Sequence, residues 1–298
     1  MSAFTVAVFA DVHGNYRALA ACLAMAEAKA AGQYLFLGDY VTDHPYPQRV
    51  LALLREAARR HPCLFVRGNR EEYMIAYRKK PAGWRDGSAQ GALLHCYENL
   101  AGEDIDWFES LPIYDVWRPK GMPPIAICHG SPTEVRGTMR EGGQELENLP
   151  AGLLLKGHNH RRISFCWQGR RVICAGSVGN PIYCRARPGR VETTPLAKQG
   201  EMLFLHLREG RWVPEFLPVP YDWQGALDDL TASGLNQRAP VWSALLRYNV
   251  LTGADPCGAV PSYAAELYRQ ETGLQAPWPQ VPEVYWQQAA LAFGVELW

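Results

Sequence analysis

The sequence has no excess of either charge, no long apolar run and no basic leader at its amino terminus. With 30 basic and 30 acidic residues its formal net charge is zero, so bulk charge does not favour nucleic acid or an anionic membrane as a partner. No apolar stretch approaches the roughly 20 residues that a membrane helix needs. The opening run MSAFTVAVFAD carries no basic residue, which predicts a strand rather than a signal peptide.

The sequence also lacks any Cys-x-x-Cys pair, although it contains eight cysteines. Several of these cysteines lie in apolar, strand-like runs. This pattern favours buried thiols in a reduced protein over a disulfide framework. We therefore expect a cytoplasmic protein.

The amino-terminal part alternates short apolar runs with helical patterns. Residues 4–9, 34–37 and 63–67 read as buried strands, and residues 15–31 and 47–60 between them read as helices. This βαβαβ order predicts a largely parallel sheet covered by helices.

The order of elements changes after the third strand. Residues 71–110 read as helical, and the strand candidates that follow are 124–128, 152–156, 162–167, 171–175 and a hairpin of 202–208 with 212–219. From Tyr221 onward the pattern is helical, without a strand signal, and rich in Trp and Tyr. We expect those aromatic residues to form a small core rather than a base-stacking platform. We place a boundary near residue 220, giving a domain of residues 1–220 and a helical extension of residues 221–298.

Short polar motifs follow five of the predicted strands. In chain order they are ADVHGN (Asp11, His13), LGDY (Asp39), GNRE (Asn69), HGSP (His129) and GHNH (His158, His160). Ligands of open α/β sheets lie at the carboxyl ends of strands, so these loops should converge. Carboxylate, amide and imidazole groups are suitable ligands for divalent metals. Each motif alone is a weak signal, and the five in this order are a strong one.

These motifs resemble the signature blocks of the calcineurin-like metallophosphoesterases over roughly residues 4–180. The stretch AGSVGNP, residues 175–181, resembles the closing block of the branch that contains small bacterial phosphodiesterases. The resemblance implies an α+β fold, a four-layer αββα sandwich with two metal ions at its apex. No family pattern covers residues 221–298.

The resemblance also assigns metal ligands and a reaction. It implies that the first metal is bound by Asp11, His13 and His160, the second by Asn69, His129 and His158, and both by a bridging Asp39. A shared carboxylate offsets part of the repulsion between two dications. The cofactors would be two divalent ions (Mn, Fe, Zn or Ni), and a metal-bound hydroxide would attack a phosphate ester, with a phosphodiester favoured.

Arg70 departs from the family pattern, in which a histidine often follows the Gly-Asn pair. Arginine stays protonated near neutral pH and cannot act as a general acid. It can hold two phosphoryl oxygens and stabilise charge in the transition state. We therefore take Asn69 and Arg70 as catalytic candidates and Arg70 as a substrate contact. The alternative is a surface pair of Arg70 with Glu71.

Three further polar residues each allow two interpretations. Asn15 either hydrogen-bonds phosphate or caps the following helix, and the sequence favours neither. His95 could replace the missing acid, but a packed helix histidine is favoured. His44 could touch substrate, but a surface position is favoured.

Other functions remain possible readings of the same motifs. A non-catalytic metal-binding module would explain Arg70, although all seven expected ligands are present. A protein phosphatase or a dinucleoside polyphosphate hydrolase would share the chemistry. A nuclease is disfavoured by the neutral charge, except on short oligonucleotides or nucleotides. We expect a small phosphate ester as substrate and no membrane partner, and make no prediction of the oligomeric state.

Overall fold

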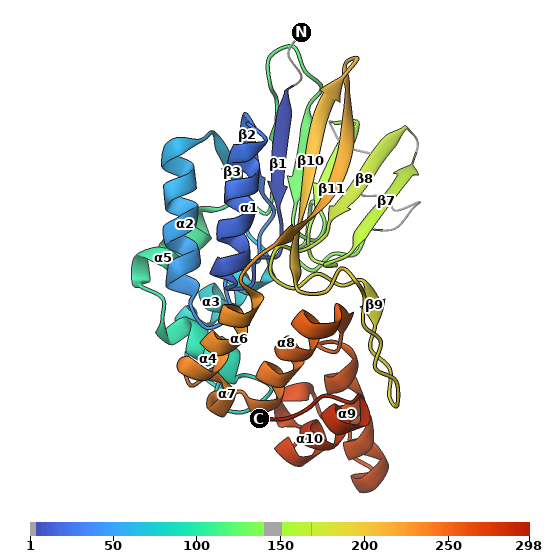
Figure 1. Ribbon diagram of the computed structural model, residues 1–298. Helices are drawn as coiled ribbons and strands as arrows, with labels where there is room; N and C mark the ends of the chain where they lie inside the picture. Colours follow the sequence, from blue (N-terminus) through green and yellow to red (C-terminus); the bar gives the residue numbers. More distant parts are fainter. Residues whose placement is uncertain (1–3, 140–150, 168) are drawn as a thin grey trace.

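The computed structural model describes residues 4–139, 151–167 and 169–298, and two five-stranded sheets form its centre (Figure 1). The first sheet has the order β11-β10-β1-β2-β3. Its strands are β1 (Thr5–Phe9), β2 (Gln33–Phe36), β3 (Cys63–Phe65), β10 (Gln199–Arg208) and β11 (Arg211–Pro220). Strands β1, β2 and β3 are parallel, and β10 joins β1 in antiparallel orientation. The expected βαβαβ start and the hairpin of β10 and β11 are both confirmed.

The second sheet has the order β4-β5-β6-β8-β7. Its strands are β4 (Tyr114–Trp117), β5 (Ile125–Cys128), β6 (Leu153–Lys156), β7 (Arg162–Trp167) and β8 (Arg170–Ala175). Strands β5, β6 and β8 are parallel, whereas the edge strands β4 and β7 are antiparallel to their neighbours. The sequence analysis missed β4, a half-buried edge strand without a strong apolar pattern.

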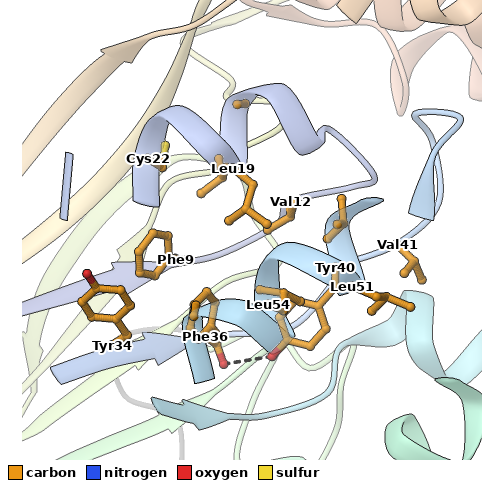
Figure 2. Packing of buried hydrophobic residues seen from close by; sticks show 14 of the residues in the cluster. Phe9, Val12, Leu19, Cys22, Tyr34, Phe36, Tyr40, Val41, Leu51 and Leu54 are labelled. Carbon is orange, nitrogen blue, oxygen red and sulfur yellow. Dashed lines mark hydrogen bonds between the residues drawn. The ribbon is translucent and has the colours of Figure 1, made fainter. Parts of the chain in front are cut away.

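The strands of the first sheet bury both faces, because successive side chains point to opposite sides. Val6 and Val8 of β1 pack toward the second sheet, and Ala7 and Phe9 pack toward the helices. The helices on that side are α1 (Tyr16–Ala28) and α2 (Pro47–Arg60). Figure 2 shows Phe9 beside Tyr34 and Phe36 of β2, with Leu19 of α1 above it and Leu54 of α2 to its right. Burial on both faces explains the continuous apolar runs of these strands.

The outer face of the second sheet carries its own apolar cluster. Met139 and Ala151 pack on this face against side chains of β5, β6 and β8. Since β5 and β6 are parallel, a crossover must join them, and residues 140–150 of that crossover lie outside the described residues. Three further helices, α3 (Asn69–Lys79), α4 (Gly91–Glu98) and α5 (Gly102–Ser110), connect β3 to β4. The described residues thus form the expected sandwich of two sheets.

The carboxy-terminal segment is helical and forms a core of its own. Its helices are α6 (Trp223–Ala232), α7 (Leu235–Arg238), α8 (Pro240–Thr252), α9 (Ala259–Thr272) and α10 (Glu283–Ala292), with a 3₁₀ turn at Trp278–Gln280. Tyr248, Tyr285 and Trp286 are buried in this core, as expected of its aromatic residues. The expectation of no strand is wrong, because β12 (Ala254–Asp255) pairs with β9 (Cys184–Arg185).

The position of this segment matters for function. In Figure 1, α8, α9 and α10 lie beyond the ends of the two sheets, on the side where β1 ends. The boundary placed near residue 220 falls between β11 and α6. The division into a domain of residues 1–220 and a helical extension of residues 221–298 stays a prediction.

Two expectations from composition also have structural outcomes. None of the helices in the described ranges is long and apolar enough to cross a membrane. All eight cysteines are free, and Cys22, Cys96, Cys128 and Cys174 are buried.

Candidate metal centre

The loops after five strands meet at one edge of the sandwich. The expected ligands follow β1 (Asp11, His13), β2 (Asp39), β3 (Asn69), β5 (His129) and β6 (His158, His160). The parallel strands of each sheet end on the same side, which brings loops distant in sequence together. Five of the seven residues are buried, and His158 and His160 are half-buried at the opening of a cavity. The structure therefore gathers all of these loops.

The backbone in these loops is strained. Asp11, His13 and Asp39 have φ angles of 54°, 51° and 54°, and His158 and His160 have 73° and 54°. Non-glycine residues rarely adopt a positive φ, and each costs on the order of 1–3 kcal/mol. Such strain concentrates at functional sites, where the surrounding structure holds it in place. Five of the expected ligands share this feature.

A first cluster combines one carboxylate and two imidazoles. The ligand atoms of Asp11, His13 and His160 all lie within 4.8 Å of one another. His160 Nε2 is 3.4 Å from Asp11 Oδ1, and His13 Nε2 is 2.9 Å from His160 Nε2. The backbone N–H of His158 donates to both oxygens of Asp11 at 3.0 Å and fixes the carboxylate.

A second cluster lies directly beside the first. His129 Nε2 is 3.2 Å from Asn69 Oδ1 and 3.4 Å from Asp39 Oδ2. The same Asp39 oxygen is 3.6 Å from His13 Nε2 of the first cluster. The ring of His158 stands edge-on to the ring of His129, with centroids 5.2 Å apart. Asp39 thus lies between the two groups.

The three closely packed imidazoles each face an oxygen with Nδ1. His129 Nδ1 is 2.8 Å from the carbonyl of Leu37, and His160 Nδ1 is 3.0 Å from the carbonyl of Asn180. A carbonyl can only accept, so both nitrogens must donate, and the Nε2 atoms of the neutral rings carry lone pairs. This arrangement fixes the tautomer that a metal ligand requires.

Asp43 plays the corresponding role for His13, and the sequence analysis missed it. Its Oδ2 lies 2.8 Å from His13 Nδ1 and 3.3 Å from the guanidinium of Arg70. Its Oδ1 accepts a hydrogen bond of 3.2 Å from Trp242 Nε1. The sequence feature that could have indicated this role is a second acidic residue four positions after Asp39, in GDYVTDH. Asp43 is buried with a φ of 66°, like the ligands themselves.

The geometry fits a bound cation. His160 Nδ1 is held by the Asn180 carbonyl and His13 Nδ1 lies 2.8 Å from the Asp43 carboxylate, so the Nε2 atoms of the two rings face each other at 2.9 Å. Two lone pairs repel at that distance unless a proton or a metal ion lies between or beside them. The donor set of carboxylate, imidazole and amide groups suits borderline divalent metals.

The ionisation of these groups follows from their mutual contacts. Burial tends to raise the pKa of Asp39, but His129, His13 and Arg70 outweigh it and lower the pKa below its ordinary value. Burial likewise opposes ionisation of Asp11, whose pKa is nevertheless lowered by His160 and His129. Both aspartates are therefore ionised near neutral pH, the state in which they bind metal.

The histidines of the second cluster respond in opposite directions. Burial lowers the pKa of His129, but Asp39 and Asp11 overcome this effect and raise it to about 9. Burial and repulsion by His129 lower the pKa of His158 to about 4. The neighbouring aspartates therefore favour a proton on His129, and a metal ion bound at its Nε2 would compete with that proton.

Arg70 reaches into the site and pairs with aspartates rather than with Glu71. Its backbone N–H donates to Asp39 Oδ1 at 2.8 Å, and its side chain pairs with Asp43. Glu71 is fully buried and accepts backbone N–H bonds from Gly68, Asp39 and Tyr40. The alternative of an Arg70–Glu71 surface pair is wrong. Arg70 also lines the cavity.

Glu71 and Gly68 together fix the position of Asp39. A Cβ atom on Gly68 would lie 2.2 Å from Asp39 Oδ1, so only glycine permits this approach. The acidic residue and the glycine of GNRE are therefore structural supports of the site.

The remaining candidates have structural contacts. Asn15 caps α1 by accepting from the Ala18 N–H, and its amide lies near the Gly179 carbonyl and Tyr221 hydroxyl. Both of its polar groups are thus engaged, which leaves the capping reading. His44 is buried with Nε2 3.2 Å from Asn180 Oδ1, so the favoured surface position is wrong.

His95 has the packing role that was favoured. Its ring is buried, and Nε2 lies 3.0 Å from the Pro45 carbonyl. Burial lowers the pKa of His95. His95 is not one of the described residues that line the cavity.

A cavity of about 340 Å³ opens onto the two clusters. One side consists of site residues, including Asn69, Arg70, His158 and His160. The opposite side comes from the carboxy-terminal segment: Trp242, Asn249, Asp255, Cys257, Gly258 and Trp278. The segment after residue 220 therefore forms a wall of the cavity, one of the roles that the sequence left open.

A two-sheet sandwich with carboxylates and histidines at its strand ends defines a metallophosphoesterase-type protein. The family model of the calcineurin-like phosphoesterases matches residues 4–167, more than half of the chain. The chain belongs to this family.

Two solved structures share the fold over most of the chain. A hypothetical protein from Pyrococcus horikoshii OT3 is similar with a TM-score of 0.64 and 20% identity, over 85% of this chain and 99% of that one. A metallophosphoesterase from Sphaerobacter thermophilus is similar with a TM-score of 0.61 and 20% identity, over 83% of this chain and 100% of that one. A comparison with curated proteins finds no match.

Proposed function

We propose that the chain is a metal-dependent phosphoric ester hydrolase that uses two divalent metal ions and favours a phosphodiester. The observation that carries this proposal is the pair of Nε2 atoms of His13 and His160, 2.9 Å apart with Nδ1 held elsewhere. Such a pair is stable when a cation is bound next to it. Family membership supplies the reaction class.

The two clusters support an assignment of the ligands. Asp11, His13 and His160 would hold the first ion, and Asn69, His129 and His158 would hold the second. Asp39 would bridge them, a role supported by its single oxygen 3.6 Å from His13 and 3.4 Å from His129. The bridging charge offsets the repulsion between two dications.

The bound ions would supply a water molecule activated at neutral pH and neutralise charge on the phosphoryl group. The residues of the chain hold the ester for attack. Arg70 lines the cavity beside Asn69, so its guanidinium can stabilise charge on phosphoryl oxygens. Burial lowers the pKa of Arg70, but Asp43 and Asp39 outweigh it and raise the pKa, so Arg70 stays charged and donates no proton to the leaving oxygen.

This assignment predicts a dependence on the leaving group. Activated aryl esters leave without a proton and should turn over far better than alkyl esters. General acid catalysis is typically worth about 10²–10⁴-fold, so its absence slows poor leaving groups without preventing hydrolysis.

The cavity also favours an enzyme over its rivals. A non-catalytic metal-binding module needs no cavity beside its metal ligands, whereas this site opens into one of about 340 Å³. Two parts of the chain line this half-open cavity, and its size favours a small ester over a protein surface or a long nucleic acid. A cytoplasmic location rests on the cysteine pattern alone and stays a prediction.

Hydrolysis of a chromogenic diester, a chromogenic monoester and a dinucleotide, each with and without manganese, tests the proposal. We expect metal-dependent hydrolysis, fastest on the diester. No hydrolysis of any substrate by protein with two bound ions would favour the non-catalytic module.

A further inference from the structure

The cavity over the metal centre has two chemically different sides. The side of the metal centre carries Arg70, the only Lys or Arg among the described residues that line the cavity. Arg70 is already paired with Asp39 and Asp43. The wall from the carboxy-terminal segment carries two indole rings, Trp242 and Trp278, and the carboxylate of Asp255.

The carboxylate on this wall is not neutralised by a basic side chain. In the described ranges no Lys, Arg or His side chain pairs with Asp255 within 4.0 Å, and its charge acts at longer range on His160. Its side-chain hydrogen bond in these ranges is a 3.4 Å contact with the Gly258 N–H. Cys257 next to it is neutral, because burial raises the pKa of its thiol well above the ordinary value. The wall thus offers a negative charge and aromatic faces, and no group that would neutralise a second phosphate.

The wall is fixed to the metal centre. Trp242 donates to Asp43, which contacts His13. Asp255 belongs to β12, which pairs with β9, and the amide of Asn249 on α8 donates to the Pro181 carbonyl. These contacts tie the wall to the loop after β8 and to the turn after β2. The two sides of the cavity therefore have a defined relative position.

We propose that this wall selects the organic part of the substrate and favours a compact group that carries a positive charge, such as an alkylammonium. Aromatic faces and a carboxylate stabilise a cation together. A second phosphate in the same place would meet the charge of Asp255 without a basic partner. The inference rests on the proposed function, since it places the phosphoryl group on the metal side, and it disfavours dinucleoside polyphosphates.

Three monoesters of similar size but different charge test the wall directly. They are 2-aminoethyl phosphate, n-propyl phosphate and 2-phosphoglycolate, and their binding to the manganese-loaded protein is measured by calorimetry. We expect 2-aminoethyl phosphate to bind about tenfold more tightly than n-propyl phosphate, as for one charge pair, and 2-phosphoglycolate to bind most weakly. Asp255→Asn should remove most of this preference while leaving n-propyl phosphate unchanged.

Two further variants support the interpretation. Asp228→Asn changes an exposed aspartate of the same segment and should leave all three affinities unchanged. Trp278→Leu changes a side chain that is 41% exposed and should weaken the binding of 2-aminoethyl phosphate more than that of n-propyl phosphate. This variant provides the test if Asp255→Asn fails to fold. Equal effects on the three esters in both wall variants would overturn the proposal.

Turnover of the chromogenic diester separates this inference from the proposed function. Hydrolysis of the diester without discrimination among the three charges refutes the proposed role of the wall and leaves the proposed function standing. Discrimination that depends on Asp255 without any hydrolysis refutes the function and leaves the wall standing. If none of the three esters binds and the diester is not hydrolysed, both fail.

Discussion

Replacing Asp43 by asparagine should weaken the metal centre although Asp43 is not an expected metal ligand. Its carboxylate contacts His13 Nδ1 at 2.8 Å, the Arg70 guanidinium at 3.3 Å and Trp242 Nε1 at 3.2 Å. Asparagine keeps the size of the side chain but removes the charge. The one remaining oxygen can accept from His13 or from Trp242, but not from both sides as the carboxylate does. Arg70 loses its closest ion pair and keeps a 3.9 Å contact with Asp39 and its position over the Tyr73 ring.

The expected loss follows from what such carboxylates do for metal-binding histidines. Removing a partner of this kind typically costs about 10–100-fold in metal affinity or activity, or about 1.4–2.7 kcal/mol. Calorimetric titration of Mn²⁺ into chelator-treated Asp43→Asn and wild-type protein measures the loss. Circular dichroism should show the same fold for both. The exposed Asp106→Asn is the control and should bind as the wild type does. Unchanged affinity for both ions in Asp43→Asn would refute the role of Asp43.

Three further outcomes follow from the same contacts. Asp39→Asn should abolish hydrolysis and release at least one ion, and elemental analysis that finds two ions in an active variant would contradict the bridging role. Trp242→Phe removes the donor to Asp43 but keeps an aromatic ring, so metal affinity should fall several-fold with an unchanged thermal midpoint, whereas a drop in the midpoint alone would indicate packing only. Burial raises the pKa of Glu201 to about 7 despite its pairing with Arg162, so the folded chain binds this proton more tightly than the unfolded chain. The free energy of unfolding should therefore fall between pH 4.5 and 7, by up to about 3 kcal/mol, and Glu201→Gln should remove this part of the dependence in urea unfolding at pH 5 and pH 8. If the free energies of unfolding of the wild type and Glu201→Gln differed by the same amount at pH 5 and pH 8, this prediction would be contradicted.

Local patterns predicted the sandwich because its strands and helices bury regular apolar faces. Phe9 and Val8 lie on opposite sides of one strand, and both sides are covered, so the strand appears as a continuous apolar run. The expected ligands could be predicted for the same reason, because each follows such an apolar run. The edge strand β4 was missed because its residues are only half-buried and alternate weakly.

The supports of the site were harder to predict, because they depend on loop geometry. His44 was expected at the surface, yet the turn after β2 packs against the turn at Gly14, where a Cβ would lie 2.5 Å from the His44 carbonyl oxygen. Asp43 reaches His13 only because Asp39, Thr42 and Asp43 adopt positive φ angles, which no sequence pattern signals.

Motif analysis could not predict the wall of the cavity, for a different reason. Trp242 and Asp255 lie far along the chain from GHNH, the last of the expected ligand motifs. They reach the cavity through the pairing of β12 with β9 and the bond to Asp43. Only the tertiary structure brings this segment to the metal side.

The measurement that tests the central claim most directly is a titration of chelator-treated protein with Mn²⁺ while hydrolysis of bis(p-nitrophenyl) phosphate is followed. A centre of two ions bridged by Asp39 predicts no hydrolysis without metal and a rate that levels off at two ions per chain. Hydrolysis that survives chelation, or a fully loaded protein that leaves the ester intact, would contradict the account.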